Sequence, residues 1–556
     1  MAKHSFPSFS DAYRKRWRDA GLWLDVTLHH GFDQTVAAQP DKVALITADQ
    51  SYTLAQYKAE SDALAAGLLG VGIGPGDIVA VQLPNWAEFC FLQIALSRIG
   101  AVIQPIHTVF RERETANLLS LCESDAIVVP DTYKDFGFAD MVRSLRPQLP
   151  ALRKVIVARG EAHAAAGESN LSDLMEEGRR NLQRLADVKT TADDIYYLNF
   201  TSGTEGNPKG FLHVHNAVIS MTKRLIPLMP PETVMLACSP MTHTFGHFEM
   251  YYTDLAGFPM VVVDRYSPGE ILTLIERERV TKLSGTPAHF FGLLHHRDFA
   301  KFDTSSVKSV AVGGARSSPD LIADLGRVWG VKSANTYGMG ETIIHTRTVP
   351  DDPEERIRST VGRPIFGVEL KIVDQKDRTV VQPAGTIGEI CFRGPTLFVG
   401  YHNLPGKTAD TRDANGWFYT GDLGYVDEAG YLYFVGRAKE VINRGGTKIH
   451  PKEIEDLLCQ HPAILQAAVV GMPDERLGER VCAYVVTRDG HEISLEEVGQ
   501  FCCERKATKY LHPEVLVRIE EMPMTPTGKI QKVALQKDAV SRATLSRATA
   551  DPAPAG

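Results

Sequence analysis

The sequence lacks the marks of several protein classes. Its 556 residues include eight cysteines, but there is no C-x-x-C pair and no histidine spacing that would complete a zinc site. Scattered cysteines of this kind are typical of a reduced, cytoplasmic protein, which is the location we expect. The formal net charge of -8 gives no general attraction to nucleic acid, so nucleic acid is not an expected partner.

Long hydrophobic runs are also missing. The N-terminal residues Met1–Pro7 contain no apolar core, so we expect no signal peptide. The most apolar segment, Phe89–Ile106, is interrupted by Gln93, Arg98 and Pro105. This interruption predicts a buried helix leading into a strand, and no integral membrane segment is expected.

The chain is too long for a single hydrophobic core, because such cores stop growing at roughly 250–300 residues. Apolar runs such as Val43–Ile46 and Ile78–Leu83 alternate with helical patterns such as Leu54–Leu69 and Trp86–Ile99. This alternation predicts an α/β fold with a large N-terminal domain of βαβ units and parallel sheets. A β-rich subdomain and a small α+β domain are expected to follow. The Ala/Ser/Thr/Pro composition of residues 541–556 predicts a disordered tail.

A polar loop, Asn199–Gly210, follows the apolar run Ile195–Leu198. Its glycines, hydroxyl side chains and lysine can direct backbone N–H groups, hydroxyls and an ammonium at one anion, most plausibly a polyphosphate. The loop is not a Walker A site, because Gly203 and Gly206 lack the required gap and Lys209 is followed by glycine. An ordinary Gly/Ser/Thr turn is the alternative.

The order T-S-G-T-E-G-N-P-K-G closely resembles the signature loop of the acyl-adenylate-forming superfamily, which includes acyl-CoA synthetases, peptide-synthetase adenylation domains and beetle luciferases. The resemblance extends from about Phe32 to Lys532. It implies that ATP is bound, and it assigns the nucleotide phosphates to the loop residues Thr201, Ser202, Gly203, Thr204, Glu205, Gly206 and Lys209.

Two later motifs match the superfamily in the same order. In the family, the run Gly313-Gly314-Ala315 lies along the adenine, and glycines would let a flat ring approach the backbone. The second motif is Tyr337-Gly338-Met339-Gly340-Glu341, in which Tyr337 offers an aromatic face to adenine and Glu341 a hard oxygen to Mg2+. Thr201 is the other expected metal contact.

One residue of this motif departs from the commonest family pattern. Gly340 stands where that pattern has a threonine that contacts the α-phosphate. Thr342 or another donor would then have to supply the contact.

Further site residues follow from the resemblance. His243 corresponds to a histidine at the entry of the carboxylate pocket, although a loop histidine is the plain alternative. Asp422, in a T-G-D sequence, would hold the ribose hydroxyls, and Arg437 would bind the ribose and phosphate side of the nucleotide. Lys529 resembles the catalytic lysine that bridges the carboxylate and the nucleotide. For Asp422 and Lys529, ordinary surface turns are the alternative.

The resemblance also implies domain boundaries and a moving part. Lys439 falls at the hinge position, which gives a large adenylation domain over 1–438 and a small mobile domain over 439–540. Rotation about the hinge would bring Gly445 and Gly446 to the channel of the incoming thiol. Coenzyme A is therefore expected as a substrate, beside ATP, Mg2+ and a small carboxylic acid.

The expected reaction activates a carboxylate, which is a poor electrophile until it is joined to AMP. Pyrophosphate leaves, and a thiol then attacks the acyl-adenylate to form a thioester. The residues near the expected acid site are apolar, namely Phe245, Phe248, Phe290, Phe291, Met339 and Ile343. We therefore expect a hydrophobic medium-chain, alicyclic or aromatic acid, as in fatty acid metabolism, and an acid–thiol ligase.

Several alternatives stay open. The hydroxybenzoate-activating relatives have Asn directly after the pocket histidine, where this chain has Thr244, but an aryl-acid–AMP ligase that loads a carrier protein remains the second interpretation. A luciferase-like oxidase is less favoured, because no sequence feature asks for it. A nucleotide sensor without catalysis is less favoured because the charged site residues are retained, namely Lys209, Glu341, Asp422, Arg437 and Lys529. The protein is expected to form a homodimer or to act alone.

Overall fold

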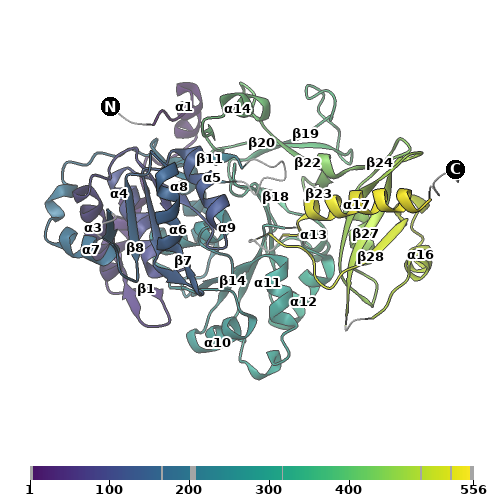
Figure 1. Cartoon of the computed structure of the whole chain (residues 1–556), viewed down its shortest axis with the longest axis horizontal. Helices are drawn as coiled ribbons and strands as arrows, with labels where there is room; N and C mark the ends of the chain where they lie inside the picture. The colour runs from purple at the N-terminus through teal and green to yellow at the C-terminus, as the bar shows by residue number, and fades with distance from the viewer. Residues whose placement is uncertain are drawn as a thin grey trace, which may run out of the picture. The chain divides into compact units, whose positions relative to one another are not determined.

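The computed structural model describes residues 4–163, 167–200, 208–315, 317–488, 491–525 and 529–550, with side chains up to residue 544. The chain divides into two compact units (Figure 1). The first unit comprises Met1–Arg358, Gly362–Glu369 and Arg393–Phe418, and the second comprises Ser359–Val361, Leu370–Phe392 and Tyr419–Gly556. The second unit thus includes segments before Lys439, and the domain boundary between residues 438 and 439 stays a prediction.

An eight-stranded sheet forms one part of the first unit. From β10 to β9 its neighbouring strands are parallel, whereas β10, β11 and β21 pair antiparallel. The strand order is β21 (Gly400–Tyr401), β11 (Gly210–Val214), β10 (Ile195–Phe200), β4 (Val102–Pro105), β3 (Ile78–Val81), β5 (Ala126–Pro130), β8 (Lys154–Ala158) and β9 (Glu168–Asn170). A short ladder, β6 (Thr132–Tyr133) and β7 (Phe136–Gly137), lies apart from it.

A nine-stranded sheet forms the other part of the first unit. Its central strands are parallel, and antiparallel strands close both edges. The order is β18 (Arg363–Pro364), β17 (Thr346–Arg347), β16 (Ala334–Tyr337), β15 (Ser309–Val312), β14 (Lys282–Gly285), β12 (Met235–Ala237), β13 (Met260–Val261), β1 (Val43–Ile46) and β2 (Ser51–Thr53).

Helices follow most of these strands, as a βαβ fold requires. Helix α3 begins with a capping box between Thr53 and Gln56, and α4 ends at Gly100, whose φ of +71° is a left-handed conformation that suits glycine. The helices are α1 (Asp11–Asp19), α2 (Leu28–Ala38), α3 (Leu54–Gly70), α4 (Ala87–Ile99), α5 (Glu112–Cys122), α6 (Phe138–Leu145), α7 (Leu171–Arg179), α8 (His215–Leu225), α9 (Thr244–Ala256), α10 (Pro268–Glu278), α11 (Pro287–Leu294), α12 (Pro319–Trp329), α13 (Glu354–Ser359) and α14 (Pro405–Thr411).

Packing of these helices covers the sheets and encloses the cores. Helix α3 packs on both α4 and α7 (Figure 1), and α4 lies against β4 and α7 against β8. Leu236, Leu283 and Val310 of the nine-stranded sheet share a fully buried cluster with residues of α10 to α12. One face of the nine-stranded sheet therefore forms the core beneath these helices.

The second unit contains two antiparallel-rich sheets. One has the order β19 (Glu369–Val373), β20 (Gly388–Arg393), β22 (Phe418–Val426) and β23 (Leu432–Arg437). The other contains β25 (Thr447–Ile449), β24 (Ile442–Arg444), β27 (Gly478–Thr487) and β26 (Ile464–Asp474), with β28 (Val515–Arg518) parallel to β27. Helices α15 (Pro451–Leu458), α16 (Leu495–Glu504) and α17 (Lys532–Ala550) complete the unit.

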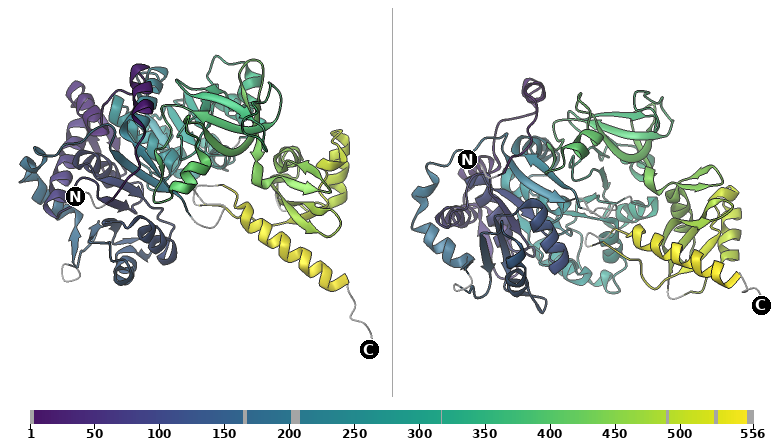
Figure 2. Two further views of the ribbon diagram at one scale, coloured as in Figure 1. Left: turned by 90° about the horizontal axis from the view of Figure 1, so that it is seen from above. Right: turned by 45° about the horizontal axis from the view of Figure 1, so that its top comes forward.

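Helix α17 corrects the expectation of disorder beyond Ser541, because it extends to Ala550. Figure 2 shows it as the long yellow helix at the end of the chain. Leu535, Ala539 and Ala543 are four residues apart, so they share one helix face, and all three are buried in a cluster with residues of β26 and β27. Burial of this stripe stabilises a helix that composition alone does not predict. Residues 551–556 lie outside the described part.

Among the described residues, no helix combines the length and the hydropathy needed to cross a bilayer. The interrupted segment Phe89–Ile106 instead forms α4 and β4, both buried.

Candidate active site

The expected phosphate loop connects two antiparallel strands. Phe200 at the end of β10 pairs with Gly210 at the start of β11. Thr201, Ser202, Gly203, Thr204, Glu205 and Gly206 lie outside the described residues. Lys209 is described, and its Nζ lies 5.3 Å from the ring centroid of Tyr401, within the range of a cation–π contact.

The segment Tyr337–Glu341 leaves the end of β16. The Tyr337 ring stacks on His345 with centroids 5.5 Å apart, so its orientation is fixed on one face. Burial lowers the pKa of His345 well below its usual range. A side chain at Gly338 would overlap the carbonyl of Ile343, and the Met339 carbonyl accepts a 2.7 Å hydrogen bond from the Ile343 N–H. The segment is therefore a tight turn that follows a half-buried aromatic ring.

Glu341 is 6% exposed, and two residues of one neighbouring segment hold it. The Tyr401 hydroxyl donates a 2.7 Å hydrogen bond to Glu341 Oε1, and the Phe398 N–H donates one of the same length to the Glu341 carbonyl. Burial, with the Glu341 charge, raises the pKa of Tyr401, so the phenol remains a donor. The carboxylate is thus fixed next to the ring that contacts Lys209.

Gly340 packs against a neighbour that leaves no room for a side chain. A Cβ at this position would overlap the ring of Phe211, which is fully buried in β11. His213, on the same strand, contacts the Gly340 carbonyl through Nε2 at 2.7 Å. Glycine in place of threonine therefore has a structural cause in this chain. Thr342, the proposed substitute donor, is 2% exposed and hydrogen-bonded to His345, so it is already engaged.

The glycine run after β15 approaches two other site elements. Gly313 is buried, and a Cβ there would lie 2.5 Å from Thr336 Oγ1 and 3.4 Å from Cζ of Phe245. Gly314 has a φ of +77°, a conformation that strongly favours glycine, and Ala315 is exposed. The fold thus gathers Phe245, Gly313 and β16 at one place.

The four phenylalanines expected near the acid have different surroundings. Phe290 is fully buried within the core cluster of the nine-stranded sheet, so its ring fills the interior. Phe291 stacks on His295, with centroids 3.9 Å apart. Phe248 is 7% exposed and packs on Tyr197 and Tyr251. Phe245 is half-buried and is the one of these four rings that lies against Gly313.

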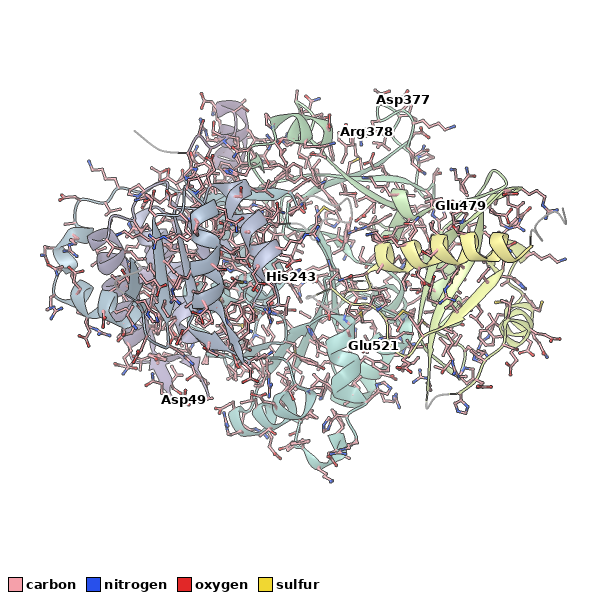
Figure 3. All side chains as sticks on the ribbon, viewed as in Figure 1. Asp49, His243, Asp377, Arg378, Glu479 and Glu521 are labelled. Carbon is pink, nitrogen blue, oxygen red and sulfur yellow. The ribbon has the colours of Figure 1, made fainter. Side chains whose placement is uncertain are left out.

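His243 caps the N-terminus of α9, where its Nδ1 accepts a hydrogen bond from the Phe245 N–H at 3.3 Å. Figure 3 labels this side chain. Its ring stacks on His107, with centroids 6.2 Å apart, and His107 is hydrogen-bonded through Nδ1 to the Thr242 hydroxyl at 2.7 Å. Burial lowers the pKa of His107 to about 4, so this ring is neutral near pH 7. His243 is therefore backed by an uncharged ring.

In the second unit, Asp422 is 5% exposed and pairs with Arg437 across β22 and β23. Arg437 Nε lies 3.6 Å from Asp422 Oδ1. The Asp422 N–H donates to Thr420 Oγ1 at 3.0 Å, and the buried carboxylate of Glu389 accepts from the Gly421 N–H at 3.1 Å. These bonds fix the part of β22 that carries Asp422, which is therefore a buried strand residue and not a surface turn.

Glu389 is itself held by Arg378, whose Nε donates to Glu389 Oε2 at 3.0 Å and whose Nη2 donates to Glu389 Oε1 at 3.3 Å. Arg378 is labelled in Figure 3, and its guanidinium lies 4.2 Å from the Tyr419 ring centroid. Sequence reasoning did not single out Glu389 or Arg378. Nothing in the sequence around Glu389 or Arg378 indicates that these two side chains pair.

The expected hinge and thiol-channel residues lie on exposed turns. Lys439 is exposed in the short helix η6 (Ala438–Glu440), between β23 and β24. Gly445 and Gly446 close the β24–β25 hairpin with φ values of +56° and +88°. A Cβ at Gly446 would meet nothing within 4 Å. Its conformation, more than a lack of space, therefore requires glycine.

Lys529 lies in a small hairpin in which Met524 pairs with Ile530. Its N–H donates to Thr525 Oγ1 at 3.0 Å, and its carbonyl accepts from the Thr525 N–H at 2.6 Å. Residues 526–528 lie outside the described part. The backbone of Lys529 is therefore anchored, and its side chain is half-buried.

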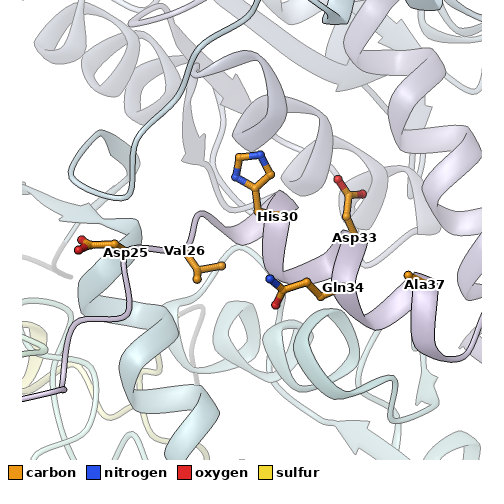
Figure 4. A pocket seen from close by; sticks show the side chains of 6 residues that line it. All are labelled: Asp25, Val26, His30, Asp33, Gln34 and Ala37. Carbon is orange, nitrogen blue, oxygen red and sulfur yellow. The ribbon is translucent and has the colours of Figure 1, made fainter.

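A surface hollow of about 510 Å³ lies elsewhere on the first unit (Figure 4). Of its acids, Asp25 is bonded to Arg18, and Asp33 to Arg98. None of the site residues expected from the sequence lines it, so it is not the candidate site. Its lining is Asp25, Val26, His30, Asp33, Gln34 and Ala37.

Comparison with known proteins now identifies the family. The AMP-binding enzyme family matches residues 32–402, and the AMP-binding enzyme C-terminal domain matches residues 453–529. The chain belongs to the AMP-binding enzyme family. These two matches include every charged residue expected in the site except Asp422, Arg437 and Lys439, which lie between them.

Full-length relatives of this AMP-binding enzyme support the same conclusion. The chain is 36% identical over 536 residues to the medium-chain fatty-acid–CoA ligase of Escherichia coli (strain K12), covering 96% of this chain and 94% of the relative. It is 32% identical over 542 residues to the 2,3-dihydroxybenzoate-AMP ligase of Bacillus subtilis (strain 168), covering 96% and 97%.

A solved structure gives the corresponding match in three dimensions. The anthranilate CoA ligase AuaEII, in complex with anthranoyl-AMP, superposes with a TM-score of 0.85 at 26% identity, covering 94% of this chain and 99% of that one. Membership of the acyl-adenylate-forming superfamily, the α/β fold class and the ligase class are therefore confirmed. The roles of the individual site residues remain predictions.

Proposed function

We propose that this AMP-binding enzyme joins a hydrophobic carboxylic acid to coenzyme A in an ATP-dependent reaction through an acyl-AMP intermediate. One observation carries the proposal: the buried Glu341 carboxylate and the Lys209 ammonium are held at the hydroxyl and the face of the same tyrosine. An acid and a cation fixed together suit a metal-bound polyphosphate. The full-length similarity to a fatty-acid–CoA ligase supports the same reaction.

The first half-reaction needs two anions to be held together. The substrate carboxylate attacks the α-phosphorus, pyrophosphate leaves, and negative charge spreads over the phosphoryl oxygens. In the proposed assignment, Lys209 neutralises the terminal phosphates and Lys529 neutralises charge between the acid and the α-phosphate. Asp422 accepts hydrogen bonds from the ribose hydroxyls, for which its buried and bonded position is suited.

The residues present fit a magnesium ion delivered with ATP. Mg2+ is commonly held by one or two carboxylates, with the remaining ligands supplied by substrate phosphates and water. Across the described residues, no three side chains from histidine, cysteine, aspartate or glutamate gather as a ready metal site. In this assignment Glu341 would be the one carboxylate ligand of the ion, and Thr201 would be the second contact. The bound ion would neutralise phosphate charge.

The second half-reaction is thiol attack on the acyl-adenylate. We propose that Lys439 is the hinge and that the hairpin turn at Gly445 and Gly446 serves the pantetheine arm. Both positions are exposed, and the positive φ angles of the glycines give a turn without side chains. An exposed turn that projects no side chain suits a slender, flexible substrate arm.

The acid is proposed to be hydrophobic. Phe245 lies against Gly313, and Met339 precedes Gly340 in the adjoining turn, so apolar groups meet where adenine and acid are expected. Thr244 stands where the hydroxybenzoate-activating relatives have Asn to meet the 2-hydroxyl, and it is half-buried at the start of α9. This favours an acid without a 2-hydroxyl group, in the medium-chain, alicyclic or aromatic class.

The second candidate is transfer of the acyl group to a carrier protein. The similarity to a 2,3-dihydroxybenzoate-AMP ligase favours it, although the CoA ligases match over the same length. A cytoplasmic location and a homodimer are also proposed. Size-exclusion chromatography with light scattering would test the homodimer.

The deciding experiment has two stages. ATP–pyrophosphate exchange is measured across octanoate, cyclohexanecarboxylate, benzoate, salicylate and an amino acid, and thioester formation is then measured with free CoA and with a phosphopantetheinylated carrier protein. We expect exchange with the first three acids and transfer to CoA. Exchange with none of the acids would refute the ligase, and transfer to the carrier protein alone would establish the second candidate.

A further inference from the structure

Tyr401 lies at the point where three parts of the first unit meet. In β21 it pairs with Phe211 of β11, the strand that follows the phosphate loop. Its N–H donates a 2.9 Å hydrogen bond to Thr408 Oγ1 of α14, so its backbone is anchored on both sides. The side chain is thereby aimed from a fixed strand position.

The segment that carries Tyr401 contacts Glu341 twice. The Phe398 N–H binds the backbone carbonyl of Glu341, and the Tyr401 hydroxyl binds the carboxylate, both at 2.7 Å. Phe398 and Tyr401 also contact each other edge to face, with centroids 4.9 Å apart. Backbone and side chain of Glu341 are therefore set by one structural element.

The same phenol ring contacts a cation. Lys209 Nζ lies 5.3 Å from its centroid, while the hydroxyl at the ring edge is bonded to the carboxylate. A tyrosine has the two properties needed here, because its face attracts cations and its hydroxyl donates to anions.

We propose that Tyr401 is a positioning residue that fixes the Glu341 carboxylate and the Lys209 ammonium for a metal-bound nucleotide. This inference rests on the proposed function and deepens it. Partners that orient a metal ligand typically change metal affinity by about 10–100-fold when they are removed. The hydroxyl and the ring should therefore have separable effects.

Two substitutions separate these effects. Tyr401→Phe removes the hydroxyl and keeps the ring over Lys209, whereas Tyr401→Leu removes both. The matched control is Tyr484→Phe, because the Tyr484 hydroxyl also donates a 2.7 Å hydrogen bond to a carboxylate, that of Asp538, and Tyr484 is almost completely buried. Asp538 has no assigned role in the reaction.

The measurement is ATP binding by calorimetry without acid, once with Mg2+ and once with EDTA. For Tyr401→Phe we expect the gain in affinity that Mg2+ confers to fall by about 10–100-fold, with ATP binding in EDTA unchanged. Tyr401→Leu should additionally weaken ATP binding in EDTA by roughly two- to fivefold. Tyr484→Phe should match the wild type in both conditions.

A double-mutant cycle tests whether Tyr401 acts through Glu341. It also separates this effect from a general loss of stability in the Tyr401 variant. Glu341→Gln keeps an oxygen that can accept the Tyr401 hydroxyl but removes the charge. In this background, Tyr401→Phe should cause no further loss of the Mg2+-dependent gain. An additive loss would overturn the inference.

Two further outcomes are decisive. If Tyr401→Phe keeps the full Mg2+-dependent gain, or weakens ATP binding equally with Mg2+ and with EDTA, Tyr401 only packs the site and the inference is overturned. If the wild type neither binds ATP more tightly with Mg2+ nor exchanges pyrophosphate, the proposed function fails first, and the inference loses its basis.

Discussion

Glu341 and Lys529, the two charged residues proposed at the reacting phosphates, are held in different ways. Glu341 is 6% exposed, with its carboxylate bonded to Tyr401 and its carbonyl bonded to Phe398. Lys529 is half-buried in a short hairpin, and Thr525 anchors its backbone. The difference indicates a preorganised acid in one unit and a lysine carried on a turn in the other, as expected if the lysine serves only one of two steps.

The largest expected effect comes from removing this lysine. Lys529→Ala should lower ATP–pyrophosphate exchange by at least ~10²–10³-fold, because loss of one group that stabilises transition-state charge has that effect in other enzymes. ATP binding should be much less affected. ATP–pyrophosphate exchange assays with radiolabelled pyrophosphate would measure the loss of exchange activity.

The matched control is Lys537→Ala, which removes an exposed lysine from α17 in the same unit. It should retain wild-type exchange. Equal activity of Lys529→Ala and Lys537→Ala would contradict the assignment and leave Lys529 as a turn residue.

The second effect concerns the proposed hinge. Lys439→Pro restricts the backbone of η6 and should keep exchange while lowering thioester formation by ~10²-fold, because misplacement of about 1 Å can reduce a step to that extent. Single-turnover assays of the two steps would separate them. If both steps fell equally, rotation about Lys439 would be excluded as the explanation.

The third effect concerns the packing that surrounds Glu341. Gly340→Thr should destabilise the protein by about 1–3 kcal/mol, because the new side chain overlaps the buried ring of Phe211. In the double variant with Phe211→Ala, the two effects should be less than additive, because the second substitution makes room for the first. Urea denaturation would measure both, and strict additivity would show that the two positions are independent.

The smallest effect on catalysis is expected for Asp254, which lies near the C-terminal end of α9, whereas His243 caps its N-terminus. Burial raises the pKa of Asp254 to about 8, although Tyr57 and Gln93 donate hydrogen bonds to it. The folded protein therefore keeps a proton at neutral pH that the unfolded chain, with an ordinary pKa of 3.8, releases. This contribution to stability is complete below pH 4, decreases as pH rises, and is lost above about pH 8.

Asp254→Asn should remove this dependence. Between pH 5 and 8 the unfolding free energy of the wild type should fall more steeply than that of the variant, by less than about 1.4 kcal/mol per pH unit. Thermal unfolding at several pH values would test it. If the unfolding free energies of the two proteins changed equally with pH, Asp254 would not be the group that holds the proton. Exchange activity at pH 7 should be similar in both proteins.

Much of the fold was predictable, because long periodic segments specify their own structure. The predicted strands at Val43–Ile46 and Ile78–Leu83 contain β1 and β3, and the helix predicted over Leu54–Leu69 is α3. The short strands β11 and β21 and the extension of α17 were not predicted. They depend on pairing and burial against distant segments, such as Phe211 opposite Tyr401, which no local pattern encodes.

The residues of the candidate site also differ in whether a local sequence pattern indicates them. Glu341 and Lys209 could be proposed as site residues from the sequence because each lies within a compact motif of glycines and polar residues, and their roles stay predictions. Tyr401, His107 and Glu389 were missed, because each supports the site from another strand or loop and looks unremarkable among its sequence neighbours. The reason for Gly340 was also hidden, since only the fold places Phe211 over it.

The hairpin β10–β11 has a consequence for how the anion is attracted. The residues after the glycine-rich loop continue as a buried strand, and α8 begins only at His215. The loop therefore does not lead directly into the first turn of a helix, so in the proposed assignment the phosphates are recognised by discrete donors and by Lys209 more than by the field of an aligned helix. Such a site should be unusually sensitive to the loss of any single hydroxyl or ammonium group, and less tolerant of substitution than a loop backed by a helix.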